Sequence, residues 1–245
     1  MKRHRYIRKL SVLLAAMAAL ILSATGPEAR AKKTVNFSIA KVFFEYNSTP
    51  NDLGVHIFLD GEDWKKLKIV NPKGRTIFEV EGKGPYKDLG LTELFFEGAE
   101  PNLADVPLAE LLDRFPAGNY QLVGKTVDGE KIVATATLTH AIPAGPSNVT
   151  AVLGINNSLV ISWDAVTDPP VGFPNVPINI VGYQVIVDRT DALRRFDVKL
   201  PATATSVTVP PEFLEPSTQY LFEVLAIEAG GNQTITEGDP FETTP

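Results

Sequence analysis

The sequence predicts an all-β protein, built from two consecutive β-sandwich domains that follow a cleaved N-terminal signal peptide. Three observations support this organisation. Apolar residues after residue 32 alternate with other residues in short runs, turn-forming residues separate the runs, and a Pro/Gly-rich segment divides the body near its middle. The chain has 245 residues, enough for a signal and two sandwiches of about 100 residues each.

The first 31 residues have the three-part pattern of a secretory signal. Met1–Lys9 is basic, Leu10–Leu22 is an apolar run, and Ala29-Arg30-Ala31 is a small-residue cleavage motif. The run has 13 residues, fewer than the roughly 20 that a membrane-spanning helix needs. We expect cleavage after Ala31 and no membrane insertion of the mature chain, with an uncleaved signal anchor as the alternative. The basic segment lacks an Arg-Arg pair, which favours the general secretory route and a secreted or periplasmic bacterial protein.

The composition of the remaining chain excludes several classes of function. From residue 32 onward there are 17 Lys and Arg against 28 Asp and Glu, a net charge of −11. This acidity argues against binding to nucleic acid or to anionic membranes. The chain has no cysteine, which excludes disulfides, thiolate metal sites and cysteine nucleophiles.

The first half, residues 32–141, is predicted to form short strands and one short helix. Residues 55–59 show the alternation of a strand, and Asp128-Gly129 between two apolar runs predicts a hairpin. We also predict a turn at Asp60-Gly61. Leucine and phenylalanine spacing across residues 108–115 predicts the helix, ended by a proline.

The boundary between the halves is a Pro/Gly-rich segment, residues 142–147, which we interpret as a linker. The second domain then covers residues 148–245. Because each side has a full set of predicted strands, we expect each half to fold alone. A fragment covering Gly145–Pro245 should melt cooperatively.

The second half has landmark residues at defined points of its predicted strands. Trp163 ends the second strand, Tyr183 lies on the third, and Leu214-Glu215-Pro216-Ser217-Thr218-Gln219-Tyr220 precedes a run of alternating core residues. In this order and spacing, residues 146–244 resemble a fibronectin type III domain. The resemblance implies a sandwich core that contains Trp163, Tyr183, Leu214 and Tyr220, with the Tyr220 hydroxyl bonded to nearby backbone in a tyrosine corner. No Arg-Gly-Asp occurs in the last hairpin, so the integrin-type adhesion of that family is not implied.

The loop Asp164–Ile180 departs from this family because it is long and contains four prolines and an isolated Phe173. A stiff, exposed loop of this kind could bind a partner. Alternatively, it packs on the neighbouring domain.

The first half resembles bacterial immunoglobulin-like domains more loosely. The residues that carry this resemblance are a strand, turn and strand over 67–78, with Asn71-Pro72-Lys73-Gly74 at the turn, and later Phe115-Pro116-Ala117-Gly118-Asn119-Tyr120. The resemblance is one of fold alone. The helix over residues 108–115 is an addition to a minimal module of this type.

No catalytic set assembles from the sequence, so we predict no enzyme, no cofactor and no metal site. His56 and His140 have no metal-ligand spacing, and the alternation around His56 predicts a surface imidazole. No nucleophile or phosphate-loop motif occurs. Two acidic clusters, residues 60–63 and Glu45-Tyr46-Asn47 with Asn51-Asp52, leave calcium binding at turns open.

Three aromatic residues outside the family core positions are candidate ligand-binding residues: Trp64, Tyr86 and Phe173. For Trp64 we favour an inward-facing strand position, with an exposed stacking surface as the alternative. We interpret the protein as an exported, non-enzymatic binding or spacer protein that mediates protein–protein or surface interactions. The alternative is a carbohydrate-binding accessory module of a secreted polysaccharide-degrading system that uses these aromatics. A small hydrolase with paired carboxylates is a third possibility. The partner, a protein or a glycan, and the oligomeric state are not specified by the sequence.

Overall fold

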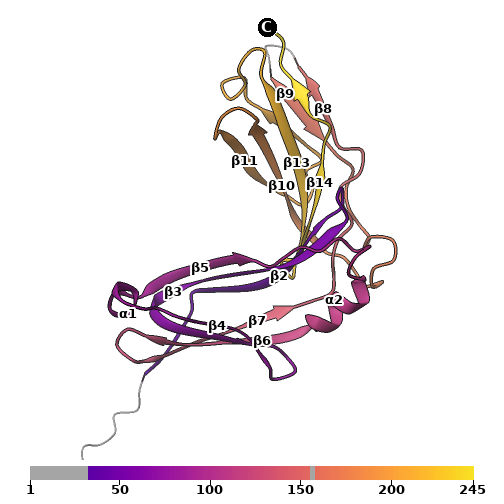
Figure 1. Cartoon of the computed structure of the whole chain (residues 1–245). Coiled ribbons are helices and arrows are strands. Elements are labelled where there is room, and N and C mark those ends of the chain that lie inside the picture. Colours follow the sequence, from indigo (N-terminus) through magenta and orange to yellow (C-terminus); the bar gives the residue numbers. More distant parts are fainter. Residues whose placement is uncertain (1–32, 155–157) are drawn as a thin grey trace, which may run out of the picture. The chain divides into compact units, whose positions relative to one another are not determined.

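The computed structural model describes residues 33–154 and 158–245. The predicted signal peptide, residues 1–31, lies outside them. The described residues form an all-β protein with two short helices (Figure 1). Within these residues, no helix is long and apolar enough to cross a bilayer.

The first half contains seven strands and both helices among the described residues. The strands are β1 (Thr34–Asn36), β2 (Ile39–Asn47), β3 (Asp52–Val70), β4 (Thr76–Glu81), β5 (Leu91–Glu97), β6 (Gly118–Thr126) and β7 (Lys131–Leu138). The helices are α1 (Pro85–Leu89) and α2 (Leu108–Arg114). Helix α2 and the β6–β7 hairpin confirm the predictions for these segments, whereas α1 was not predicted.

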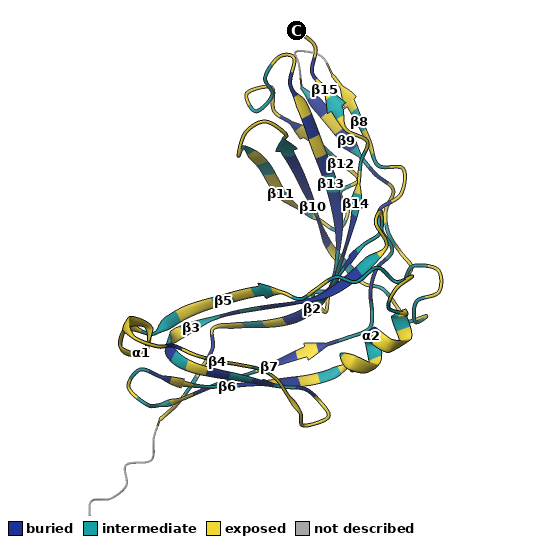
Figure 2. Cartoon of the chain, in the orientation of Figure 1, coloured by how far each residue is buried: buried dark blue, intermediate teal, exposed yellow. Residues whose placement is uncertain are grey.

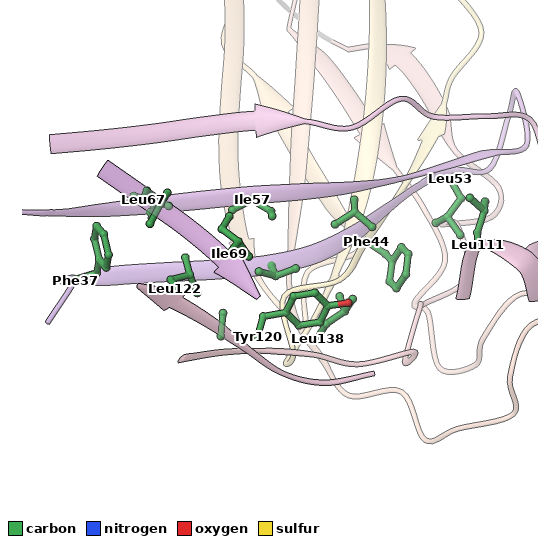
Figure 3. Close-up of a cluster of buried hydrophobic side chains, with 14 of the residues drawn as sticks. Phe37, Phe44, Leu53, Ile57, Leu67, Ile69, Leu111, Tyr120, Leu122 and Leu138 are labelled. Atoms are coloured by element: carbon green, nitrogen blue, oxygen red, sulfur yellow. The ribbon is translucent and has the colours of Figure 1, made fainter. Parts of the chain in front are cut away.

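Strand β3 is 19 residues long and organises this half. Its first part pairs with β2 and β5, and its second part pairs with β4 and β6. The strands therefore form two layers joined by β3, with the core between them (Figures 1 and 3). The turn predicted at Asp60-Gly61 is wrong, because both residues lie inside β3. The glycine serves close packing instead: a Cβ atom on Gly61 would lie 2.9 Å from Cδ1 of Phe37.

The core of the first half consists of inward-facing residues of both layers together with Leu111 of α2. The residues labelled in Figure 3 are Phe37, Phe44, Leu53, Ile57, Leu67, Ile69, Leu111, Tyr120, Leu122 and Leu138. Buried and exposed positions alternate along β6 and β7, as expected for strands with one covered face (Figure 2). Ile142, in the predicted linker, is also fully buried in this core.

The second half forms two open sheets. Its strands are β8 (Thr150–Leu153), β9 (Leu159–Ser162), β10 (Ile180–Arg189), β11 (Arg195–Pro201), β12 (Ser206–Val209), β13 (Gln219–Glu228), β14 (Gln233–Glu237) and β15 (Phe241–Glu242). One sheet has the order β12-β9-β8, and the other runs β14-β13-β10-β11 with β15 beside β13. Strand β11 was not among the predicted strands.

The two halves are joined by backbone pairing as well as by the connecting chain. Strand β14 pairs in parallel with β2, with Gln233 opposite Glu45 and Ile235 opposite Asn47. The larger sheet of the second half therefore continues into the first half. Each half still has its own hydrophobic cluster. The division into independently folding domains remains a prediction.

Candidate functional site

Three side chains that can ligate a metal meet beside the β2–β14 pair. Glu45 lies on β2, His56 lies on β3, and Glu100 lies in the segment after β5. The Nε2 atom of His56 is 3.0 Å from Oε1 of Glu100 and 3.7 Å from Oε1 of Glu45. The ligand atoms of these three residues all lie within 4.8 Å of one another. Among the described residues, this is the one such group of three or more His, Asp or Glu side chains.

Strand register brings these residues together. In the antiparallel β2–β3 pair, Glu45 is opposite Gly54 and Phe43 is opposite His56, so Glu45 and His56 project from the same face. Gly54 leaves the space that Glu100 occupies. A Cβ atom at Gly54 would lie 2.5 Å from Cγ of Glu100 and 2.7 Å from its Oε1. The glycine is thus required for the close approach of the Glu100 side chain.

Amide side chains hold both carboxylates in position. The Nδ2 group of Asn47 donates to Oε2 of Glu100 at 2.9 Å and to Oδ1 of Asp52 at 2.8 Å. The Nε2 group of Gln233, on β14, donates to Oε2 of Glu45. Each glutamate therefore has its Oε2 atom engaged by an amide, while its Oε1 atom faces His56.

The cluster is largely withdrawn from water and carries excess negative charge. The exposed fractions of the side chains are 3% for His56, 14% for Glu45 and 18% for Glu100. Burial raises the pKa of the Glu100 carboxyl; the hydrogen bond with His56 opposes this effect, and the nearby charges of Glu45 and Glu97 add to it. Within the described residues, His56 is the ion-pair partner of both glutamates. Two carboxylates thus face a single imidazole.

The prediction that His56 is a surface imidazole is wrong, since the residue is only 2% exposed. Its ring lies between Phe43, at 5.3 Å between ring centroids, and Phe95, at 5.9 Å. The alternation of apolar residues in the sequence correctly predicted that His56 and Ile57 lie on opposite faces of the strand. The face that bears His56 is nevertheless covered, because side chains of β2 and β5 and the segment bearing Glu100 lie over it.

Asn232 is fully buried and forms a second polar centre at the junction between the two halves, where β14 pairs with β2. Its Oδ1 accepts a hydrogen bond from the backbone N–H of Phe44 at 2.9 Å. Its Nδ2 donates to the carbonyl and hydroxyl oxygens of Thr139 and to the carbonyl of Ala141, each at 3.0 Å. One side chain therefore satisfies backbone groups of β2 and of the chain that leaves β7.

The three aromatic residues predicted as ligand-binding candidates do not form a platform. Trp64 is fully buried on β3, which confirms the inward-facing position and rules out an exposed stacking surface. The pairing of β3 with β5 and β6 encloses it. Phe173 is half-buried, and its ring centroid lies 4.9 Å from that of Tyr46. Its loop thus packs on the first-half core. Of the three, Tyr86 on α1 is exposed, at 59%.

The residues implied by the fibronectin resemblance occupy core positions. Trp163, Tyr183 and Tyr220 are buried, and Leu214 packs against them half-buried. The Tyr220 hydroxyl accepts a hydrogen bond from the backbone N–H of Glu215 at 2.9 Å, which is the expected tyrosine corner. The Tyr183 hydroxyl likewise accepts from the N–H of Val166 at 2.8 Å.

The comparison with protein families covers this second half. Residues 144–244 match the fibronectin type III domain family. The C-terminal half is a fibronectin type III domain. Its three-stranded sheet packed against the β14-β13-β10-β11 sheet agrees with this assignment. Domains of this sandwich type are typically non-catalytic.

Several solved structures are similar to parts of the chain. A structure described as a myokine has 26% identity and a TM-score of 0.33, and the match covers 42% of this chain and 99% of that one. The FN1–FN3 domains of chicken CNTN1 have 15% identity and a TM-score of 0.40, over 88% of this chain and 66% of that one. The fn3 domain of the human collagen alpha-1(XX) chain has 22% identity and a TM-score of 0.29, over 44% and 87%.

Proposed function

We propose that this protein is an exported, non-enzymatic binding or spacer protein that mediates protein–protein or surface interactions in or outside a bacterial envelope. The observation that carries the proposal is a fibronectin type III domain whose β14 strand pairs with β2 of the preceding half. Backbone pairing and the buried Asn232 hydrogen bonds connect the two halves in addition to the linker. Two β-sandwiches connected in this way suit a binding or spacer protein.

The loop Asp164–Ile180 supports a binding role. Phe173 anchors it on the first-half core, while Val171 at its tip is fully exposed. An apolar residue presented on a proline-stiffened, anchored loop loses little conformational entropy on binding. The glycan alternative has less support, because Trp64 is buried and Phe173 is packed on Tyr46.

The non-enzymatic role is supported by the positions of the histidines. His56 lies within the Glu45–Glu100 cluster, and Nε2 of His140 lies 3.0 Å from the carbonyl oxygen of Phe115. The Nε2 atoms of these two histidines thus contact a carboxylate and a backbone carbonyl rather than a serine or threonine hydroxyl, which a nucleophile–base pair requires. We expect the purified protein to show no hydrolysis of peptide, ester or polysaccharide substrates above buffer.

Photo-crosslinking in the native host tests the binding role. A photoreactive amino acid replaces Val171 in one strain and Leu193 in another; both positions are fully exposed and apolar. We expect a discrete crosslinked partner from position 171 and none from position 193. The partner, once purified, should bind the wild-type protein with an affinity that Val171→Asp lowers at least about tenfold, as expected for loss of an interface anchor. Equal crosslinking at both positions would contradict a specific loop site, and selective binding on a glycan array would favour the carbohydrate alternative.

Export is tested separately by the N-terminal sequence of the protein recovered from the envelope and the medium. We expect Lys32 as the first residue. A protein retained in the cytoplasm with Met1 intact would contradict the exported role and leave the binding measurement unaffected.

A further inference from the structure

We propose that Glu45, His56 and Glu100 form a binding site for a single Zn²⁺ ion, with Oε1 of each glutamate and Nε2 of the histidine as ligands. Zinc bonds to such atoms at about 2.0–2.2 Å, so adjacent ligand atoms of a tetrahedral site are about 3.4 Å apart. The His56 nitrogen lies 3.0 and 3.7 Å from the two Oε1 atoms, on either side of that value. Small side-chain movements would therefore complete the geometry.

The ligand types select zinc over the hard cations. Imidazole nitrogen and carboxylate oxygen are both zinc ligands, and three protein ligands leave the fourth position of a tetrahedral site open to water. Calcium prefers six to eight oxygen ligands and magnesium an octahedron of oxygens. A buried histidine at the centre of the cluster does not suit either ion. The acidic residues 60–63, the other calcium candidate, are not gathered into such a group within the described residues.

The hydrogen bonds around the cluster orient the ligand atoms. Asn47 engages Oε2 of Glu100, and Gln233 engages Oε2 of Glu45. Both Oε1 atoms are left facing Nε2 of His56. Outer hydrogen bonds of this kind fix ligand orientation in metal sites. The amides are thus placed as positioning residues for the metal ligands.

Charge and shape support the same site. A divalent cation would neutralise the negative charge of two partly buried carboxylates, whose ion-pair partner within the described residues is His56. Gly54 supplies the space in which Glu100 approaches, since any side chain there would collide with it. The sequence predicted no metal site, because Glu45 and Glu100 are far apart in the chain and His56 has no neighbouring ligand motif.

Because Gln233 lies on β14 and Glu45 on β2, zinc would bind where the fibronectin domain pairs with the first half. An ion that binds the folded state alone raises its stability. We therefore expect zinc to stabilise the strand pairing between the two halves.

The test uses the purified, untagged protein after treatment with chelator and dialysis. Titration with ZnCl₂ in a calorimeter should show one ion per chain, and the melting temperature should rise to saturation at the same ratio. CaCl₂ and MgCl₂ at equal concentrations should produce neither effect. Cobalt(II) added in place of zinc should show the intense visible absorption of a four-coordinate ion. A weak, octahedral cobalt spectrum together with no 1:1 zinc binding would overturn the proposal.

Variants locate the site. His56→Asn and Glu100→Gln should each lower zinc affinity at least about tenfold, and Asn47→Ala should lower it less because it acts on orientation. The matched control is Glu93→Gln, an exposed carboxylate on β5, opposite Asp60 in the β3–β5 pair, which should bind zinc as the wild type does. If either ligand variant fails to fold, Glu45→Gln serves in its place. Zinc binding that survives in all folded ligand variants, or is lost equally in Glu93→Gln, would overturn the assignment.

Discussion

Each half of the molecule has one buried tryptophan and one buried tyrosine whose hydroxyl is hydrogen-bonded to a backbone group a few residues earlier in the chain. In the first half these are Trp64 and Tyr120; in the fibronectin domain they are Trp163 and Tyr220. In both halves the indole N–H has no hydrogen-bond partner within the described residues. The two cores thus use the same aromatic elements, although a family resemblance had assigned core positions to them in the fibronectin domain alone.

The two tyrosines differ in the direction of their hydrogen bonds. Tyr120 donates to the carbonyl of Pro116 at 3.1 Å, whereas Tyr220 accepts from the N–H of Glu215 at 2.9 Å. Burial raises the pKa of Tyr120 to about 12, so it remains a neutral donor at any physiological pH. Unpaired backbone N–H groups are rarer in proteins than under-satisfied carbonyls. Tyr220 should therefore be the more sensitive of the two.

The largest expected effect comes from truncating the tryptophans. Trp163→Ala should destabilise the fibronectin domain by about 3–5 kcal/mol through the cavity it leaves. The chain has two tryptophans, so Trp64 then becomes the single fluorescent reporter of the first half. Because the two hydrophobic clusters are separate, we expect Trp64 fluorescence in urea to report a transition near that of the wild type. The reciprocal variant, Trp64→Ala, should leave the Trp163 transition in place; a joint shift in both would show that the halves unfold as one unit.

Breaking the junction should have the next largest effect. Asn232→Ala leaves the N–H of Phe44 and the carbonyls of Thr139 and Ala141 without this buried partner, at a cost of about 2–3 kcal/mol in free energy of unfolding. The control is Asn119→Ala, an exposed residue bonded to Thr137, which should change stability by less than about 0.5 kcal/mol. Urea melts followed by circular dichroism measure both. Equal effects would show that the buried amide does not stabilise the junction.

The tyrosine hydroxyls should have smaller effects. Tyr220→Phe should cost about 1 kcal/mol or more, because it removes the acceptor for the Glu215 N–H. Tyr120→Phe should cost less, since a carbonyl is left without its partner. Tyr86→Phe is the exposed control and should stay within about 0.5 kcal/mol. A larger loss at Tyr120 than at Tyr220 would reverse the ranking of the two corners.

The smallest effect concerns pH and Glu223 on β13. Burial raises the pKa of Glu223; Arg195 opposes this, while Glu45, Asp188 and Glu237 add to it. The folded state then holds this proton more tightly than the unfolded state, so the group lowers stability as pH rises above the ordinary glutamate range. The free energy of unfolding of Glu223→Gln, taken relative to that of the wild type, should therefore be higher at pH 7 than at pH 4. Urea melts at both pH values measure this difference, and the exposed Glu212→Gln should show no such change.

Much of the secondary structure was predictable because its signals are local. The period of two along β6 and β7, the Asp-Gly turn between them and the spacing of apolar residues in α2 each depend on neighbouring residues. The core positions of Trp163 and Tyr220 followed from an ordered set of landmarks in one domain. The prediction of a turn at Asp60-Gly61 was wrong because it, too, depended on neighbouring residues alone. The Asp-Gly pair is a local turn signal, but pairing on both edges keeps β3 extended.

The sequence by itself determined the all-β class, most strands of the fibronectin domain and its tyrosine corner, since period, turns and landmarks act over a few residues. Only the tertiary structure decided the burial of His56 and Trp64 and the meeting of Glu45, His56 and Glu100. Alternation tells which face a side chain takes, but not whether another strand or loop covers that face. The pairing of β14 with β2 joins residues nearly two hundred positions apart, and it sets both the Asn232 hydrogen bonds and the Gln233 contact with Glu45. Such contacts depend on strand register and chain path, which no local pattern specifies.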